Sequence, residues 1–353
     1  MPATASRLAE VLARHWLASV VALGFPAAVT GQEDPPEQER HQPCFAQPLE
    51  DSTEIAVTGD GEYAGAITLE HFHVYYGGLG PAGFMNFGSR PIGMAPHPTR
   101  SQMAVAVGNV RLVDMATRKS VAEFKPASYY AAWRKGGTRL LGIGYDGNVR
   151  TWDVATRKET TAKWKLPLGK KESARFFEYN DAAGLLALGF DDGRVRIFEA
   201  DTGREAATIK AHPVEGELKL NGVSLSPDGK RLATSDFSQI KVWDVATGEM
   251  KHRFSTRPGG LARFVRFYAG GKRLAFANPV AGGYGFQFID AETGDTVGKG
   301  PIGSGSIEGW DMAFPDSDDP LIVAIADQVL FWCRYKAVVG LTKGITIKGG
   351  PPR

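Results

Sequence analysis

The chain has 353 residues, of which 43% are apolar, 10% are aromatic and 43 are glycine, and its formal net charge is +2. A chain of this length and composition can bury a large core and fold as an ordinary globular protein. The nearly neutral charge argues against a nucleic-acid-binding surface, which needs a clustered excess of lysine and arginine. Two cysteines without a CxxC motif or a histidine cluster argue against zinc. We expect neither a metal nor another cofactor.

The first 31 residues have the order of a secretory signal peptide. Arg7 and Arg14 precede an apolar run from Trp16 to Val29, and small residues follow up to Gly31. This run is shorter than the roughly 20 residues that a transmembrane helix needs. We therefore expect residues 1–31 to be cleaved and the mature chain, without a stable membrane span, to be secreted or periplasmic. The alternative is a buried helix or an uncleaved segment that anchors the chain to a membrane.

Residues 32–50 are polar and rich in proline, which predicts a disordered linker. This linker contains Cys44. In an oxidising compartment a disulfide between Cys44 and Cys333 would tie the linker to the last repeat of the chain. Two free thiols are the alternative, because the sequence does not establish that the two Cα atoms come within about 7 Å.

From residue 51 to residue 345 the chain repeats one short phrase, a strand of period-two alternation followed by a tight turn. The five clear copies are VRLVDMATRK from Val110, VRTWDVATRK from Val149, VRIFEADTGR from Val195, IKVWDVATGE from Ile240 and FQFIDAETGD from Phe286. Their spacing of 39 to 46 residues, filled by strands alone, is typical of propeller blades. Weaker copies ending at Tyr76 and Cys333 favour seven blades, with six as the alternative.

The turn after each strand has a physical explanation in its residues. The acidic residue can accept a hydrogen bond from a backbone N–H two residues on, and Gly203, Gly248 and Gly294 suit a left-handed conformation. Arg118 and Arg157 occupy the same position in two other copies. Those turns either change type or carry strain of about 1 kcal/mol.

The segment VSLSPDGKRLATSDFSQIKVWDVATG, from Val223 to Gly248, resembles a blade of the WD-repeat (Trp-Asp repeat) β-propeller family. With the apolar N-terminus, the chain resembles an exported bacterial member of that family. The resemblance implies an all-β fold, a single β-propeller of four-stranded blades over residues 51–345, followed by a C-terminal tail over residues 346–353. The fold hosts many unrelated activities and does not by itself assign one.

The family resemblance also implies structural residues. Family blades contain a buried network of a histidine, a serine or threonine, a turn aspartate and a tryptophan. One unit offers every part: His212, Ser235, Asp236 and Trp243. Two other units keep only the spacing from aspartate to aromatic residue: Asp146 with Trp152, and Asp192 with Phe198.

Catalytic signatures are missing from the sequence. No GxSxG, Walker or HExxH motif is present, and the GxGxxG match from Gly142 to Gly147 runs into a strand rather than the helix that a dinucleotide site requires. We therefore assign no catalytic residue and expect a non-catalytic protein-binding or scaffolding module. The alternative is a propeller enzyme, a hydrolase or quinone-dependent oxidoreductase, with its site in the central funnel near Glu178 and Arg266.

The resemblance implies where a partner docks. In the family, the loops before the innermost strands and the turns between the second and third strands commonly form the docking face. Aromatic side chains in such loops are frequent contributors to binding. The residues on this face would be Tyr129, Tyr145, Asp191, His212, Phe237 and Tyr284. The expected partner is another protein or a peptide, and not a nucleic acid.

Overall fold

A computed structural model of the chain describes residues 44–48, 52–68, 71–76, 81–160, 164–169, 172, 174–212, 220–236, 238–256, 263–280, 283–303, 307–313, 321–326 and 329–334. All of them belong to one compact unit, residues 39–353. The predicted signal peptide and the predicted tail over residues 346–353 lie outside the described residues. Among the described residues no helix is long and apolar enough to cross a bilayer.

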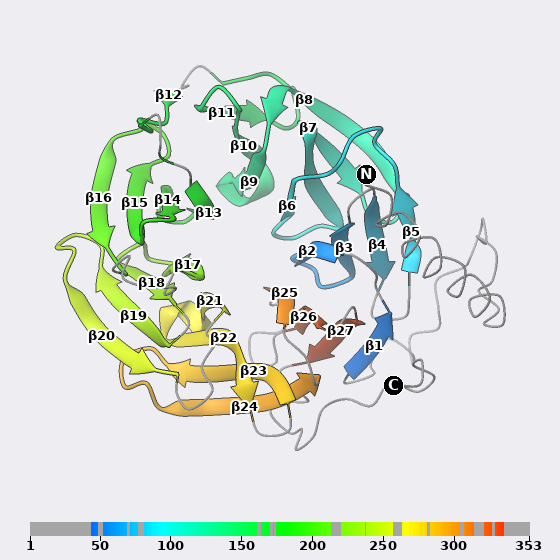
Figure 1. The fold of residues 1–353 in the computed structure, drawn as a ribbon. Coiled ribbons are helices and arrows are strands. Elements are labelled where there is room, and N and C mark those ends of the chain that lie inside the picture. The colour runs from blue at the N-terminus through cyan, green and yellow to red at the C-terminus, as the bar shows by residue number, and fades with distance from the viewer. Residues whose placement is uncertain are drawn as a thin grey trace, which may run out of the picture. The chain divides into compact units, whose positions relative to one another are not determined.

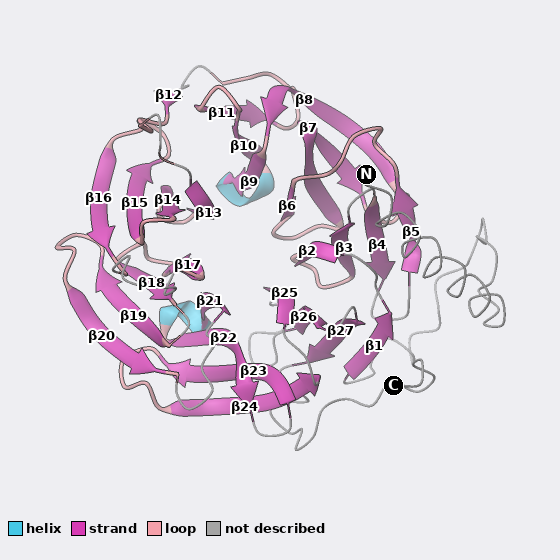
Figure 2. Cartoon of the chain, viewed as in Figure 1, coloured by secondary structure: helices cyan, strands magenta, loops and turns pink. Residues whose placement is uncertain are grey.

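The regular secondary structure of the described residues consists of strands, as Figure 2 shows, apart from two short 3₁₀ turns at Lys135–Gly137 and Ala269–Gly271. Six sheets are four-stranded and antiparallel. Five follow chain order: β2 (Ser52–Val57), β3 (Tyr63–Thr68), β4 (Phe72–Tyr76) and β5 (Pro81–Met85); β9 (Tyr130–Arg134), β10 (Arg139–Ile143), β11 (Asn148–Asp153) and β12 (Trp164–Lys165); β13 (Ala174–Asn180), β14 (Leu185–Phe190), β15 (Arg194–Glu199) and β16 (Glu205–Lys210); β17 (Gly222–Leu225), β18 (Arg231–Ser235), β19 (Gln239–Asp244) and β20 (Met250–Ser255); and β21 (Arg263–Tyr268), β22 (Arg273–Val280), β23 (Gly283–Asp290) and β24 (Thr296–Gly303).

The sixth four-stranded sheet joins the two ends of the described chain. It contains β25 (Ile307–Ala313), β26 (Leu321–Ala326), β27 (Val329–Arg334) and, on the outside of β27, β1 (Cys44–Pro48). Figure 1 shows β1 in blue beside β27 in red. Residues 44–48 therefore form a strand, although the sequence places them in a disordered linker. The free edge of β27 supplies backbone hydrogen-bond partners for this short segment.

The sheets are arranged as a propeller, with β2, β6, β9, β13, β17, β21 and β25 nearest the axis (Figure 1). β2 neighbours β25 on one side and β6 (Gly93–Pro96) on the other, and β17 neighbours β13 and β21. The predicted all-β single propeller of four-stranded blades is confirmed. Six of the seven described sheets are four-stranded blades, and six is the alternative number that the repeats allowed.

The sheet that contains β6 is three-stranded and takes its own place in the ring, between β2 and β9. Its members are β6, β7 (Gln102–Asp114) and β8 (Lys119–Ser128). The long strand β7 reverses its direction at Gly108, whose φ is +89°. The reversal brings the two ends of β7 together, where Met115 N–H donates to Ser101 O at 3.0 Å. The second and third strands of this repeat are thus the two arms of β7.

The core lies between neighbouring blades. Val195 and Ile197 of β15 pack with Val223 and Leu225 of β17 and with Trp243 of β19, all nine-tenths or more buried. Similar apolar clusters lie between other neighbouring blades of the described chain, for example Phe276 of β22 with Val242 of β19. The alternating apolar positions of these repeats supply the clusters, which hold the blades between β2 and β24 against one another.

The turns after the repeated strands have one geometry. The Asp114, Asp153, Asp244 and Asp290 carboxylates each accept from the N–H of a threonine three residues on, at 2.8 to 3.0 Å. Asp290 also accepts from the N–H of Glu292, two residues on, at 2.9 Å, as the sequence predicts. The residue after the threonine is left-handed in every copy: Gly203, Gly248 and Gly294 have φ of +71° to +78°, and Arg118 and Arg157 have φ of +54° and +59°. The two arginine turns keep the same turn type, so their backbones carry strain.

Arg118→Gly should raise the free energy of unfolding by about 0.5–1 kcal/mol, because glycine removes left-handed strain of about 1–2 kcal/mol and restores some backbone entropy to the unfolded chain. Gly248→Arg is the matched control in a sister turn, where a Cβ would meet nothing within 4 Å. It should be destabilising by a similar amount through backbone strain alone. Urea unfolding of both variants measures the two shifts, and a stabilising Gly248→Arg would contradict the explanation.

Candidate functional site

We call top face the side of the ring that carries the loops leading into the innermost strands and the turns between second and third strands. At least two of these loops are bonded to the turn of the preceding blade through backbone hydrogen bonds. Leu166 N–H donates to Gly147 O at 2.8 Å, and Ala211 N–H donates to Gly193 O at 3.1 Å. These bonds fix the height at which each loop leaves the top face. The aspartate turns lie on the opposite, bottom face.

An aromatic cluster lies at the top face between the β9 blade and the β13 blade. Tyr129, at the end of the loop into β9, contacts Tyr145 in the β10–β11 turn with ring centroids 5.4 Å apart. Phe177 of β13 packs edge-on against Tyr129 at 5.5 Å and stacks on Tyr130 at 5.2 Å. Tyr145 is 69% exposed, which makes it the outermost member. The structure thus brings together Tyr129 and Tyr145, two residues that the sequence assigned to the docking face.

The other residues predicted for docking are distributed differently. Asp191 is exposed on the same face and pairs with Arg175 at 3.3 Å. His212 is 2% exposed and offers no surface to a partner, because both of its ring nitrogens are engaged inside its blade. Phe237 and the side chain of Tyr284 lie outside what the structure describes.

The buried network of the β17–β20 blade contains His212. Its Nδ1 lies 2.8 Å from Asp236 Oδ2 and its Nε2 lies 2.9 Å from Thr234 Oγ1, which accepts from Trp243 Nε1 at 2.9 Å. The hydroxyl in the network is therefore that of Thr234 and not of Ser235, whose buried Oγ has no hydrogen-bond partner among the described residues. Burial opposes ionisation of Asp236, but the hydrogen bonds from His212 and from two backbone N–H groups outweigh it and lower its pKa to about 2.

Two turn aspartates that keep the family spacing make other contacts. Asp146 binds Arg150 and the N–H of Asn148, whereas Trp152 Nε1 donates to Lys125 O at 3.0 Å. Asp192 accepts from the N–H and, at 2.6 Å, the Nε of Arg194, while Phe198 packs against Trp164. Among the described residues, neither aspartate is hydrogen-bonded to the aromatic residue of its pair.

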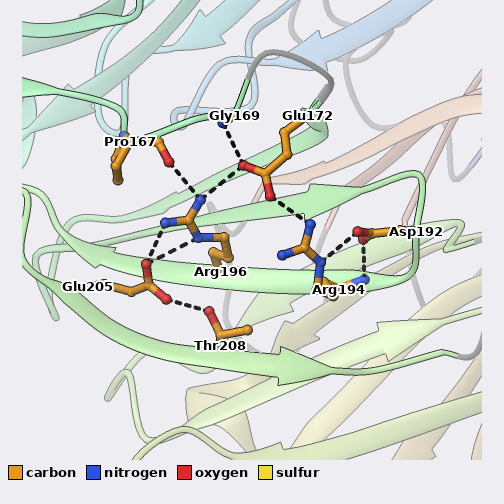
Figure 3. Close-up of polar contacts among 8 residues, drawn as sticks. All are labelled: Pro167, Gly169, Glu172, Asp192, Arg194, Arg196, Glu205 and Thr208. Carbon is orange, nitrogen blue, oxygen red and sulfur yellow. Dashed lines mark hydrogen bonds and ion pairs between the residues drawn. The ribbon is translucent and has the colours of Figure 1, made fainter.

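Polar contacts bind the connector between β12 and β13 to two arginines of β15 (Figure 3). Glu172 accepts from Arg194 at 2.6 Å, from Arg196 at 3.3 Å and from Gly169 N–H at 2.9 Å. Arg196 also donates to Pro167 O at 2.9 Å and to Glu205 at 2.5 Å. The Gly169 N–H and the Arg194 guanidinium lower the pKa of Glu172. The network fixes the approach to β13, and with it the height of Phe177 beside Tyr129.

A second group of polar side chains, the channel cluster, lies on the innermost strands: Glu54 of β2, Tyr130 of β9, Glu178 of β13, Arg266 of β21 and Asp311 of β25. Arg266 pairs with Asp311 at 3.4 Å, and Asp311 also accepts from Val57 N–H at 3.0 Å. Glu178 is hydrogen-bonded by Ser224 of the next blade. Tyr130 belongs to both clusters, so the channel cluster continues upward into the aromatic cluster.

Charge in the channel is not balanced. Three carboxyl groups share one guanidinium, and Arg266 is already paired with Asp311. Burial raises the pKa of Glu54 and of Glu178 to about 7, although Arg266 lowers both. Burial likewise raises the pKa of Asp311. Both glutamates therefore change between the neutral and the ionised form near neutral pH. Such groups suit acid–base chemistry as well as recognition of a cationic group.

Glu178→Gln should raise the melting temperature at pH 8 and leave it unchanged at pH 4. The folded pKa of about 7 lies above the unfolded value of about 4.3, so wild-type stability falls as pH rises from about 4 through 7. Glutamine does not ionise and escapes this loss. Glu205→Gln is the control, because hydrogen bonds from Arg196 lower the pKa of Glu205. This variant should lower the melting temperature at pH 8, the opposite of the change expected for Glu178→Gln. A Glu178→Gln difference that does not change between pH 4 and pH 8 would contradict the assignment.

Sequence reasoning had identified Glu178 and Arg266 but missed Glu54 and Asp311. The signal that could have found them is a charged residue in the first, otherwise apolar strand of a repeat. Within the described ranges, no group of three histidine, cysteine, aspartate or glutamate side chains is placed to hold a metal ion.

No protein-family model matches the chain. Two curated relatives show partial similarity. A chicken protein named U3 small nucleolar RNA-associated protein 15 homolog is 23% identical over an aligned length of 213 residues, and the match covers 48% of this chain and 40% of the relative. Retinoblastoma-binding protein homolog 5 of Caenorhabditis elegans is 33% identical over 97 residues, 27% of this chain and 20% of the relative. The blades and these matches together support a WD-repeat propeller. The aligned parts span less than half the length of either relative.

Proposed function

We propose that the chain is a non-catalytic WD-repeat propeller that binds another protein or a peptide through its top face. The observation that carries the proposal is the aromatic cluster. Tyr145 projects with 69% exposure from a turn that Gly147, at φ +76°, holds in place, and its ring rests on Tyr129. A tyrosine whose ring already packs against a neighbouring side chain loses little side-chain entropy on binding. The similarity to two relatives with blades of this kind agrees with a binding role.

Tyr145→Ala should abolish capture of the partner and leave the melting temperature within about 1 °C, because an exposed turn side chain contributes little to stability. The matched control is Phe84→Ala on the outer strand β5, an equally large aromatic side chain with 60% exposure. Each protein is used as bait for a native envelope extract, and the captured proteins are identified by mass spectrometry. A partner retained by Tyr145→Ala and lost by Phe84→Ala would overturn the assignment of the top face.

We also propose that this binding takes place after export. The support is the N-terminal sequence alone, with its two arginines, apolar run and small residues in signal-peptide order. The intact mass of the protein from its native host should correspond to a chain that begins near residue 32. A soluble species that begins at Met1 would contradict export.

A second candidate function is catalysis in the channel. The channel cluster favours it, because carboxyl groups with a pKa of about 7 can both donate and accept protons at neutral pH. Carboxyl groups that donate and accept protons suit a hydrolase rather than a quinone-dependent oxidoreductase. Hydrolysis of a panel of model esters and glycosides would be lost in Glu178→Gln and kept in Tyr145→Ala. Absence of turnover in the wild type leaves the docking function as the better account.

A further inference from the structure

The two cysteines of the chain lie opposite each other at the point where the ring closes. Strand β1 pairs antiparallel with β27 in a register that runs from Cys44 opposite Cys333 to Pro48 opposite Val329. The partners are 289 positions apart in the sequence, and the chain has no other cysteine. Among the described sheets, only the sheet of β1 and β27 combines a strand from the start of the described chain with strands from its end.

Backbone register decides whether a disulfide can form. Residues directly opposite in an antiparallel pair have Cα atoms about 4.5 or 5.5 Å apart, depending on whether the pair is hydrogen-bonded, and they share one face of the sheet. Both separations lie within the range of about 4.4–6.8 Å that disulfides span. A shift of one residue would put the two positions on opposite faces.

We propose that Cys44 and Cys333 form an intramolecular disulfide that locks the propeller ring covalently. The bond joins the strand contributed by the N-terminal segment to the last strand of the described chain. It therefore supplements the backbone hydrogen bonds of a short strand at the edge of the blade. It is a modification of the fold that does not depend on which partner the top face binds.

The reaction is thiol–disulfide exchange with a small disulfide such as oxidised glutathione. The thiolate of one cysteine attacks the glutathione disulfide, which breaks the S–S bond, releases one glutathione thiolate and leaves a mixed disulfide. The second protein thiolate attacks the protein sulfur of that intermediate and expels the second glutathione. Two protein thiols are oxidised, one glutathione disulfide is reduced, and the two protons pass to the two glutathione thiolates.

The test uses residues 32–353, without the predicted signal peptide, incubated folded with oxidised glutathione, then denatured and alkylated. We expect no free thiol before reduction, two after reduction, and one disulfide-linked peptide pair that contains Cys44 and Cys333. The oxidised protein should melt roughly 5–10 °C above the reduced protein, because the bond closes a very long loop. Cys44→Ser and Cys333→Ser should each show a melting temperature that reductant does not change.

Three results would overturn the proposal: two titratable thiols after oxidation, a disulfide dimer between chains, or one glutathione held on each cysteine. The control Cys44→Ser/Phe45→Cys moves the thiol one position along β1, opposite Trp332. It should end as a glutathione adduct without an internal bond. An internal bond in this variant would mean that β1 does not hold the register on which the proposal rests.

Discussion

Asp236→Ala should lower the free energy of unfolding by about 3–5 kcal/mol, the cost of removing one partner from a buried, hydrogen-bonded charged network. Asp236 is 1% exposed. Its Oδ2 meets His212, and its Oδ1 accepts from the N–H groups of Ser238 and Gln239 at 2.7 and 2.9 Å. The Ser238 hydroxyl also donates to Oδ1 at 3.1 Å, and alanine would remove the acceptor of all four donors. Thermal unfolding should show a melting temperature about 6–15 °C lower.

Two further variants separate this network from an ordinary turn. Asp192→Ala removes the corresponding turn aspartate of the preceding blade, which is 43% exposed and pairs with Arg194, and should cost less than about 1 kcal/mol. Asp236→Asn keeps an oxygen for the two backbone N–H groups and should give an intermediate loss. Equal losses for Asp236→Ala and Asp192→Ala would show that the buried network does not stabilise the blade.

The second large effect is expected from deletion of residues 321–353. The deletion removes β26 and β27, so that β25 and β1 both lose their partners and the ring loses its closing blade. In a closed ring each blade is packed on two sides, and opening the ring exposes an apolar layer at each break. We expect the truncated chain to be unfolded at 25 °C, as measured by circular dichroism and by the dispersion of amide signals, and to show no cooperative transition on heating.

Deletion of residues 346–353 alone is the control for this truncation. It removes no strand among those the structure describes and should leave the melting temperature unchanged. If the chain lacking residues 321–353 melts cooperatively at the wild-type temperature, the blades stabilise one another only in neighbouring pairs, and ring closure contributes nothing.

The repeats predicted the propeller because each copy contains its own local signals. A strand of period two, an acidic turn residue and a left-handed residue such as Gly248 act within about ten positions, so the sequence states them directly. Strand β1 lacks such signals. Residues 44–48 become a strand because β27 offers a free edge, which is a tertiary effect that local propensity does not contain.

The network of the β17–β20 blade shows a finer limit. Thr234 and Ser235 are neighbours with similar hydroxyl groups, but successive residues of a strand face opposite sides. The pattern of residue types placed a hydroxyl near His212 without deciding which of the two faces it. Only the register of β18 with β19, where Thr234 lies opposite Lys241, settles the side.

The candidate sites depended still more on the fold. Tyr129 and Tyr145 come from consecutive loops of one repeat, so the resemblance could place both on one face. Glu54 and Asp311 lie at opposite ends of the chain and meet only because the ring closes. His212 was assigned to the docking face because its loop lies there, but its side chain turns inward to Asp236.

Site-specific cross-linking measures the docking surface most directly. A photoreactive benzoylphenylalanine replaces Tyr145 in one variant and Phe84 in another, and each is irradiated in a native envelope extract. We predict a covalent adduct with one protein partner from position 145 and none from position 84. Adducts from position 84 alone, or an identical set from both positions, would contradict docking through the top face.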